Sequence, residues 1–129
     1  YQTKSIARLK LWGRVLARLE HQSDLKLVWS SVPYLDFEKC GAKLSDVKGV
    51  IEELIFSSPQ AEVVLLLYQT QDRKIIGELY TKPNINSKYL LSNYSVQGSK
   101  NFVSFSLDNK KLRQAEEEVL QTIKNKLKT

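Results

Sequence analysis

The residue types that usually carry out catalysis are few and scattered in this sequence of 129 residues. It has one histidine, His21, and one cysteine, Cys40, and its five aspartates stand apart at positions 24, 36, 46, 72 and 108. Glu116 to Glu118 fall within a helical pattern, so their carboxylates point in different directions. We find no Ser/His/Asp or Cys/His pairing, metal-ligand cluster or glycine-rich phosphate loop. The sequence therefore predicts no catalytic residue and no resident metal or other cofactor.

Composition and charge describe a globular domain with a preference for anionic partners. Hydrophobic residues make up 42% and charged residues 26% of the chain, and the net charge is +6. Such a charge is compatible with nucleotides or nucleic acids as ligands, and also with a basic surface that is merely solvated. The longest apolar run, Val63 to Tyr68, is far shorter than a membrane span, so we expect no membrane segment. A single cysteine is compatible with a reducing compartment, and we expect a cytoplasmic protein. Because the chain starts at Tyr1 and lacks methionine, we expect it to be a piece of a longer protein.

The first segment, roughly Thr3 to His21, has the periodicity of a helix. Its predicted buried stripe consists of Leu9, Trp12, Leu16 and Leu19. The basic residues Lys10, Arg14 and Arg18, spaced by four, should stay exposed on a nearly opposite face. Gly13 interrupts this pattern and is expected to weaken the helix.

The rest of the chain alternates between strand and helix patterns. A strand over Leu25 to Ser31 precedes a short helix, Tyr34 to Cys40, that Gly41 should close. The remaining expected elements are a helix capped by Ser45 that extends to Phe56, a hairpin over Glu62 to Thr70 and Lys74 to Thr81, a helix over Ser87 to Tyr94, a strand over Asn101 to Leu107, and a helix from Lys110 capped by Asp108 or Asn109. This order predicts an α/β fold with a mixed four- to five-stranded sheet flanked by helices.

Two stretches of the sequence resemble a known family. LKLWGRVLARLE, Leu9 to Glu20, is similar to the linker helix between the two lobes of DHH-family phosphoesterases. The hairpin Ala61 to Lys82, followed by SVQGSKNFVSFSL at Ser95 to Leu107, resembles their C-terminal DHHA1 lobe. The resemblance extends to Asp46 and Gly49 in the middle of the chain. It implies a linker helix over residues 1–22 and a DHHA1-like substrate-binding domain over residues 23–129.

The resemblance also implies a function and a set of contact residues. The chain would bind short RNA, short DNA or a cyclic dinucleotide for hydrolysis by a RecJ-like nuclease, a nano-RNase or a cyclic-dinucleotide phosphodiesterase. The catalytic manganese ions would lie in an N-terminal DHH domain of the same protein, outside this sequence. The residues that would contact the ligand are Tyr80, Thr81, Lys82, Gly98, Ser99, Lys100 and Asn101. Tyr80 would either stack on a base or serve only in the packing of its strand.

The sequence departs from the family at this substrate segment. Ser95 to Ser99 replace a run of glycines and a histidine, and Tyr80-Thr81 replace an Arg-Ser pair. Glycines let a backbone approach phosphate closely and arginine binds phosphate bidentately, whereas Val96 and Phe102 would crowd the ligand. The alternative function is therefore a non-catalytic interaction module that keeps the fold and has lost nucleotide binding.

Overall fold

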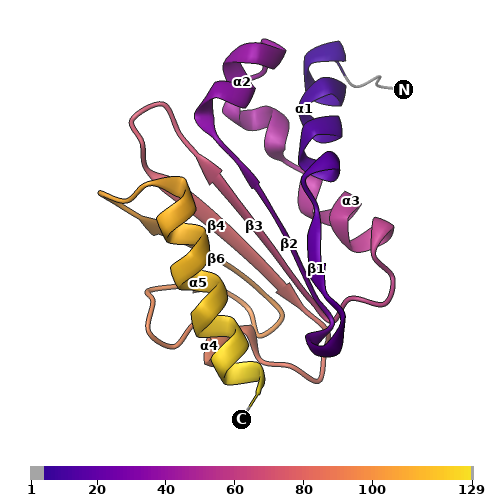
Figure 1. The fold of residues 1–129 in the computed structure, drawn as a ribbon, viewed down its shortest axis with the longest axis vertical. Coiled ribbons are helices and arrows are strands. Elements are labelled where there is room, and N and C mark those ends of the chain that lie inside the picture. Colours follow the sequence, from indigo (N-terminus) through magenta and orange to yellow (C-terminus); the bar gives the residue numbers. More distant parts are fainter. Residues whose placement is uncertain (1–4, 129) are drawn as a thin grey trace.

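The computed structural model describes residues 5–128, which form a six-stranded sheet with helices on both faces (Figure 1). The strands are β1 (Glu20–Gln22), β2 (Leu27–Val32), β3 (Val63–Gln69), β4 (Ile75–Thr81), β5 (Gln97–Gly98) and β6 (Phe102–Leu107). Their order is β1-β2-β3-β4-β6-β5. The pairing of β2 with β3 is parallel and the other pairs are antiparallel. The predicted mixed sheet is confirmed, with the short β1 and β5 as additional strands.

Within residues 5–128, five α-helices and two short 3₁₀ helices precede, connect or follow these strands. The α-helices are α1 (Ile6–Ala17), α2 (Tyr34–Cys40), α3 (Val50–Ser57), α4 (Ser87–Leu90) and α5 (Leu112–Leu127). The 3₁₀ helices are η1 (Ser23–Leu25) and η2 (Leu44–Val47). Gly41 ends α2 in the left-handed conformation, as predicted. Ser45 lies within η2 and Gly49 precedes α3, so Ser45 does not cap that helix. Lys111 precedes α5, so Asp108 and Asn109 do not cap it either.

The sheet separates two hydrophobic cores. Val64, Leu66 and Tyr68 of β3 face the core formed with α1, α2 and α3. Val63, Leu65 and Leu67 alternate with them and face the core formed with α5 and the α4 segment. Because both faces of β3 are covered, its sequence is a continuous apolar run, as predicted. The expected stripe of α5 is likewise buried at Ala115, Val119 and Ile123.

Helix α1 buries a different face from the one that the sequence predicts. Leu11, Trp12 and Val15 are buried, whereas Leu9 is 54% and Leu16 is 37% exposed. The predicted stripe is therefore wrong except for Trp12. Leu19 lies beyond the end of α1 and is only partly buried. His21 lies in β1 and not at the end of a helix. The predicted start at Thr3 lies outside the described residues.

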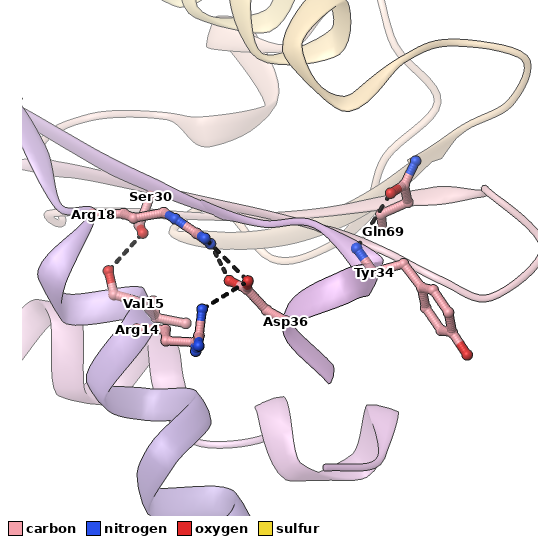
Figure 2. Close-up of polar contacts among 7 residues, drawn as sticks. All are labelled: Arg14, Val15, Arg18, Ser30, Tyr34, Asp36 and Gln69. Atoms are coloured by element: carbon pink, nitrogen blue, oxygen red, sulfur yellow. Dashed lines mark hydrogen bonds and ion pairs between the residues drawn. The ribbon is translucent and has the colours of Figure 1, made fainter. Parts of the chain in front are cut away.

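A buried carboxylate joins α1 to α2 (Figure 2). Asp36 of α2 is 1% exposed and forms ion pairs with Arg14 and Arg18 of α1, at 3.4 Å for the Arg14 pair. A second polar contact joins α1 to β2, because the Ser30 hydroxyl donates to the carbonyl oxygen of Val15 over 2.7 Å. The side chains of Arg14 and Arg18 are thus partly exposed, as predicted, but both also form ion pairs with Asp36. These contacts fix α1 against the sheet.

Candidate functional site

The seven predicted contact residues lie together at one end of the sheet. Tyr80 at the end of β4 pairs with Phe102 at the start of β6. One residue further, the Thr81 N–H donates to the Asn101 carbonyl oxygen over 2.9 Å. The segments 80–82 and 98–101, which are distant in the sequence, are therefore neighbours. The structure brings the predicted set together.

Thr81 and Asn101 use their side chains to hold this end of the sheet. The Asn101 amide nitrogen lies 2.8 Å from the Lys82 carbonyl oxygen, 3.1 Å from that of Ile85 and 3.3 Å from the Thr81 hydroxyl. The Thr81 hydroxyl donates to the Ile85 carbonyl oxygen over 2.8 Å, and Thr81 is fully buried. Their polar groups are engaged within the protein, which makes both residues structural supports of the site.

Ser87, which the sequence analysis did not single out, completes this support. Its N–H and its hydroxyl both donate to the Lys100 carbonyl oxygen, over 2.7 and 2.6 Å. Ser87 is fully buried at the start of α4. The sequence does place a serine at the expected start of this helix, but it does not show that the hydroxyl binds a segment 13 residues away. The contact fixes the backbone at Lys100.

Gly98 and Ser99 shape the turn that presents Lys100. Gly98 has a φ of 135°, and a Cβ there would lie 2.2 Å from the Phe102 carbonyl oxygen. The Ser99 N–H donates to that same oxygen over 2.8 Å, and the Ser99 hydroxyl accepts from the Phe102 N–H over 3.2 Å. Glycine is therefore required at position 98 by the packing of the protein's own backbone.

The side chains of Lys82 and Lys100 remain available at this end of the sheet. Lys100 is exposed and Lys82 is partly exposed. Neither ammonium group forms a hydrogen bond or ion pair with the part of the chain that the structure describes. Val96 packs into the core on the α5 side, whereas Phe102 is 41% exposed beside Tyr80. The structure thus offers two cations and an aromatic pair in one place.

The face of β4 and β6 opposite α5 is half open. Ile76, Glu78 and Tyr80 alternate with the buried Ile75, Gly77 and Leu79 along β4. Across the strand pair, Glu78 lies opposite Ser104 and Tyr80 opposite Phe102. Burial, together with the nearby Glu52 carboxylate of α3, raises the pKa of Glu78. Burial and the Glu78 charge in turn raise the pKa of Tyr68 on β3 to about 12.

Pockets lie at other places on the molecule. One of about 470 Å³ is lined by His21, Lys26 and Gln60, among others, near the start of β2. Another of about 960 Å³ lies between the β3–β4 turn, with Arg73 and Lys74, and the start of α5. The predicted contact residues line neither pocket. His21 is exposed, whereas Cys40, the last residue of α2, is buried in the core.

The metal-ligating side chains also stay apart. Among residues 5–128, no three His, Cys, Asp or Glu side chains come close enough together to hold a metal ion. No helix within the same residues is both long and apolar enough to cross a membrane. The described part of the chain offers a surface of cations and aromatic rings.

The mixed sheet with helices on both faces is a DHHA1-like fold, which solved structures share. An exopolyphosphatase-related protein from Bacteroides fragilis matches 99% of this chain with a TM-score of 0.80 and 19% identity. The pGpG-specific phosphodiesterase PggH from Vibrio cholerae matches 92% with a TM-score of 0.57 and 13% identity. The chain spans 36% and 40% of the length of these two proteins. No protein-family model matches the sequence, and no curated protein matches it by sequence.

Proposed function

We propose that this chain is the substrate-binding domain of a DHH-type phosphoesterase that acts on short oligonucleotides or cyclic dinucleotides in the cytoplasm. The observation that carries the proposal is the likeness over 99% of the chain to an exopolyphosphatase-related protein nearly three times as long. A pGpG-specific phosphodiesterase shares the fold as well. Two larger proteins that share this fold are thus named for the hydrolysis of phosphate compounds.

In this proposal the end of the sheet binds the ligand through few groups. Lys82 and Lys100 contact phosphate, while Gly98 and Ser99 hold Lys100 in place. Tyr80 stacks on a base, which stabilises binding by about 1–3 kcal/mol. Thr81 and Asn101 position the two strand ends and do not contact the ligand, because their polar groups are already engaged. We therefore propose that Thr81 and Asn101 support the site and do not contact the ligand directly.

The chemical step lies outside the described residues. The manganese ions that the family resemblance implies would activate water for attack on a phosphodiester. The described residues do not fit such ions, because no cluster of suitable side chains is present among them. We therefore place the ions in an N-terminal DHH domain of the same protein and derive no step through them.

A non-catalytic interaction module is the second candidate function. It is favoured by the exposed apolar side chains of α1, since Ile6 is 72% and Leu9 is 54% exposed. The engagement of Thr81 and Asn101 within the protein favours it as well. In this alternative the chain binds another protein surface and no nucleotide.

Titration of the chain with a short RNA and with pGpG, followed by amide NMR, separates the two functions. Binding at the sheet end should shift residues 80–82 and 98–101, and Lys100→Ala should weaken it. In a plot of the logarithm of the affinity against the logarithm of the salt concentration, the slope should be only about −0.7 per phosphate contact. The chain alone should hydrolyse neither ligand, with or without manganese. The absence of shifts at millimolar ligand, or turnover that copurifies with the chain, would contradict the proposal.

A further inference from the structure

The half-open face of β4 and β6 carries an aromatic pair that is suited to a flat ring. Tyr80 and Phe102 are direct partners across the two strands, so their side chains stand about 5 Å apart at Cβ on the same face. Phe102 is 41% exposed, and Tyr80 is partly exposed. Aromatic side chains on an open sheet face are a common platform for stacking nucleobases.

A carboxylate without a counter-charge lies next to this pair. Glu78 is two residues before Tyr80 on the same face of β4, which is about 7 Å along the strand. It is half-buried, and within residues 5–128 it forms no hydrogen bond or ion pair. Its charged neighbour is a second carboxylate, Glu52 of α3, and the burial of Glu78 with this neighbour raises its pKa. A half-buried carboxylate is costly unless donors satisfy it, so this position favours a ligand that brings hydrogen-bond donors.

The chemistry of the base edges selects one ligand. An ionised carboxylate accepts hydrogen bonds and donates none. Of the four common bases, guanine alone presents two adjacent donors, N1–H and N2–H, on its Watson–Crick edge, whereas adenine, cytosine and uracil each place an acceptor beside the donor. Two parallel hydrogen bonds to one carboxylate form the strongest and most specific arrangement.

We propose that the open face of β4 and β6 is a guanine subsite, in which Tyr80 and Phe102 stack on the base and the Glu78 carboxylate accepts hydrogen bonds from its N1–H and N2–H groups. This inference rests on the function proposed above and names the base that the site prefers. Lys100 and Lys82, at the end of the same strands, are placed for the phosphate of the nucleotide. Lys82 follows Tyr80 by two residues and Lys100 precedes Phe102 by two, a spacing that suits a 5′-mononucleotide or the end of a short RNA.

Titrations of the full chain with GMP, IMP, AMP, CMP and UMP test the subsite. IMP keeps N1–H and lacks the N2 amino group, so it should bind about tenfold more weakly than GMP, and the other three nucleotides at least as weakly. Glu78→Gln keeps the side-chain size and should abolish this preference for GMP. Glu52→Gln is the matched control, because it removes the neighbouring carboxylate outside the platform and should leave the preference intact.

The outcomes distinguish this inference from the function on which it rests. Equal binding of the five nucleotides, weakened for all of them by Lys100→Ala, would overturn the guanine subsite and leave nucleotide binding in place. A GMP preference that survives Glu78→Gln in a folded variant would also overturn the subsite. Failure of every nucleotide and of short RNA to bind at millimolar concentration would overturn the proposed function itself. A guanine-ended RNA that binds more tightly than its adenine-ended counterpart, and loses this advantage in Glu78→Gln, would support the subsite.

Discussion

The indole N–H of Trp12 donates a hydrogen bond to the backbone carbonyl oxygen of Asp46 over 2.8 Å. The Trp12 ring also covers Gly49, where a Cβ would lie 3.3 Å from the ring. Arg8, one turn earlier, donates to the Lys48 carbonyl oxygen over 3.0 Å. One side of α1 is therefore bound to the segment between α2 and α3, and Trp12 is the centre of that contact.

Removal of the Trp12 side chain should strongly destabilise the chain. Trp12 is 9% exposed, and truncation of a large core side chain to alanine costs about 3–5 kcal/mol. Trp12→Phe keeps most of the apolar contact and loses the hydrogen bond, so it should cost less. Urea denaturation measures both, with Leu9→Ala on the more exposed face of α1 as a control expected to lose much less stability. A Trp12→Ala variant as stable as the control would show that α1 does not pack here.

Removal of the Asp36 carboxylate and removal of its two arginine partners should cost different amounts of stability. Replacement of both Arg14 and Arg18 by alanine leaves the buried Asp36 carboxylate without a counter-charge, which costs about 3–5 kcal/mol. Asp36→Asn leaves two arginine side chains that are 41% and 40% exposed, so their guanidinium groups can be hydrated. We expect the asparagine variant to lose less stability than the double arginine variant in urea denaturation. Equal losses would show that the burial of Asp36 does not determine the cost.

Two glycine-to-alanine substitutions should change stability in opposite directions. Gly13 lies within α1, and a Cβ added there would meet no other atom within 4 Å, so Gly13→Ala should stabilise the chain by about 0.5–1 kcal/mol. At Gly98 the φ of 135° and the contact with the Phe102 carbonyl oxygen make alanine unfavourable by about 1–3 kcal/mol. Thermal unfolding of the two variants against the parent chain gives the signs. A stabilising Gly98→Ala would contradict the described turn.

Asn101 and Lys100 are adjacent, and their substitution should separate support from binding. Asn101→Ala removes the donor to the carbonyl oxygens of Lys82 and Ile85 and should cost about 1–3 kcal/mol of stability. Lys100→Ala should change stability by no more than about 0.5 kcal/mol, because its side chain is exposed. Denaturation and RNA titration of both variants test this division. A loss of stability in Lys100→Ala equal to that in Asn101→Ala would contradict it.

The raised pKa of Glu78 predicts a specific dependence of stability on pH. In the folded state Glu78 retains its proton at pH values where the unfolded chain, with a pKa near 4.5, has released it. Glu78 therefore contributes most to stability below the pKa of the unfolded chain, and this contribution is lost as the pH rises through the raised pKa of the folded state. Glu78→Gln cannot ionise, so it should be more stable than the parent at neutral pH, with this advantage lost in acid. Urea denaturation at several pH values measures the difference, and a constant difference would contradict it.

The sequence predicts those elements whose pattern has a single interpretation. The continuous apolar run of β3 and the spacing of Ala115, Val119 and Ile123 in α5 each fit one structure. In α1, apolar residues lie on more than one face, and the periodicity does not distinguish the face with Leu11 and Val15 from the face with Leu9 and Leu16. The sheet and its neighbouring helices decide between them. β1 and β5 have three and two residues, too few for a recognisable alternation.

The proximity of the predicted contact residues could be expected from the sequence, whereas their role in binding stays a prediction. The resemblance to the DHHA1 lobe indicates segments 80–82 and 98–101, which the structure places side by side. The partners of Asn101 lie 16 to 20 residues away in the sequence. No local pattern shows that its amide is used within the protein. The open face with Glu78 could not be predicted either, because an alternating strand shows which residues share a face and not whether a helix covers it.

The single parallel pairing in the sheet affects how the chain folds. β3 and β4 form a hairpin, and β6 pairs antiparallel with β4 after the segment that contains α4 and β5. β2 joins them only when Leu27 pairs with Val63, which requires closure of a loop that contains α2, η2 and α3. A long loop must lose entropy before the contact that closes it can stabilise the chain. We therefore expect the hairpin of β3 and β4 to form before β2 pairs with β3. In this order β2, with β1 and the helix α1 that contact it, joins the edge of a hairpin that has already formed.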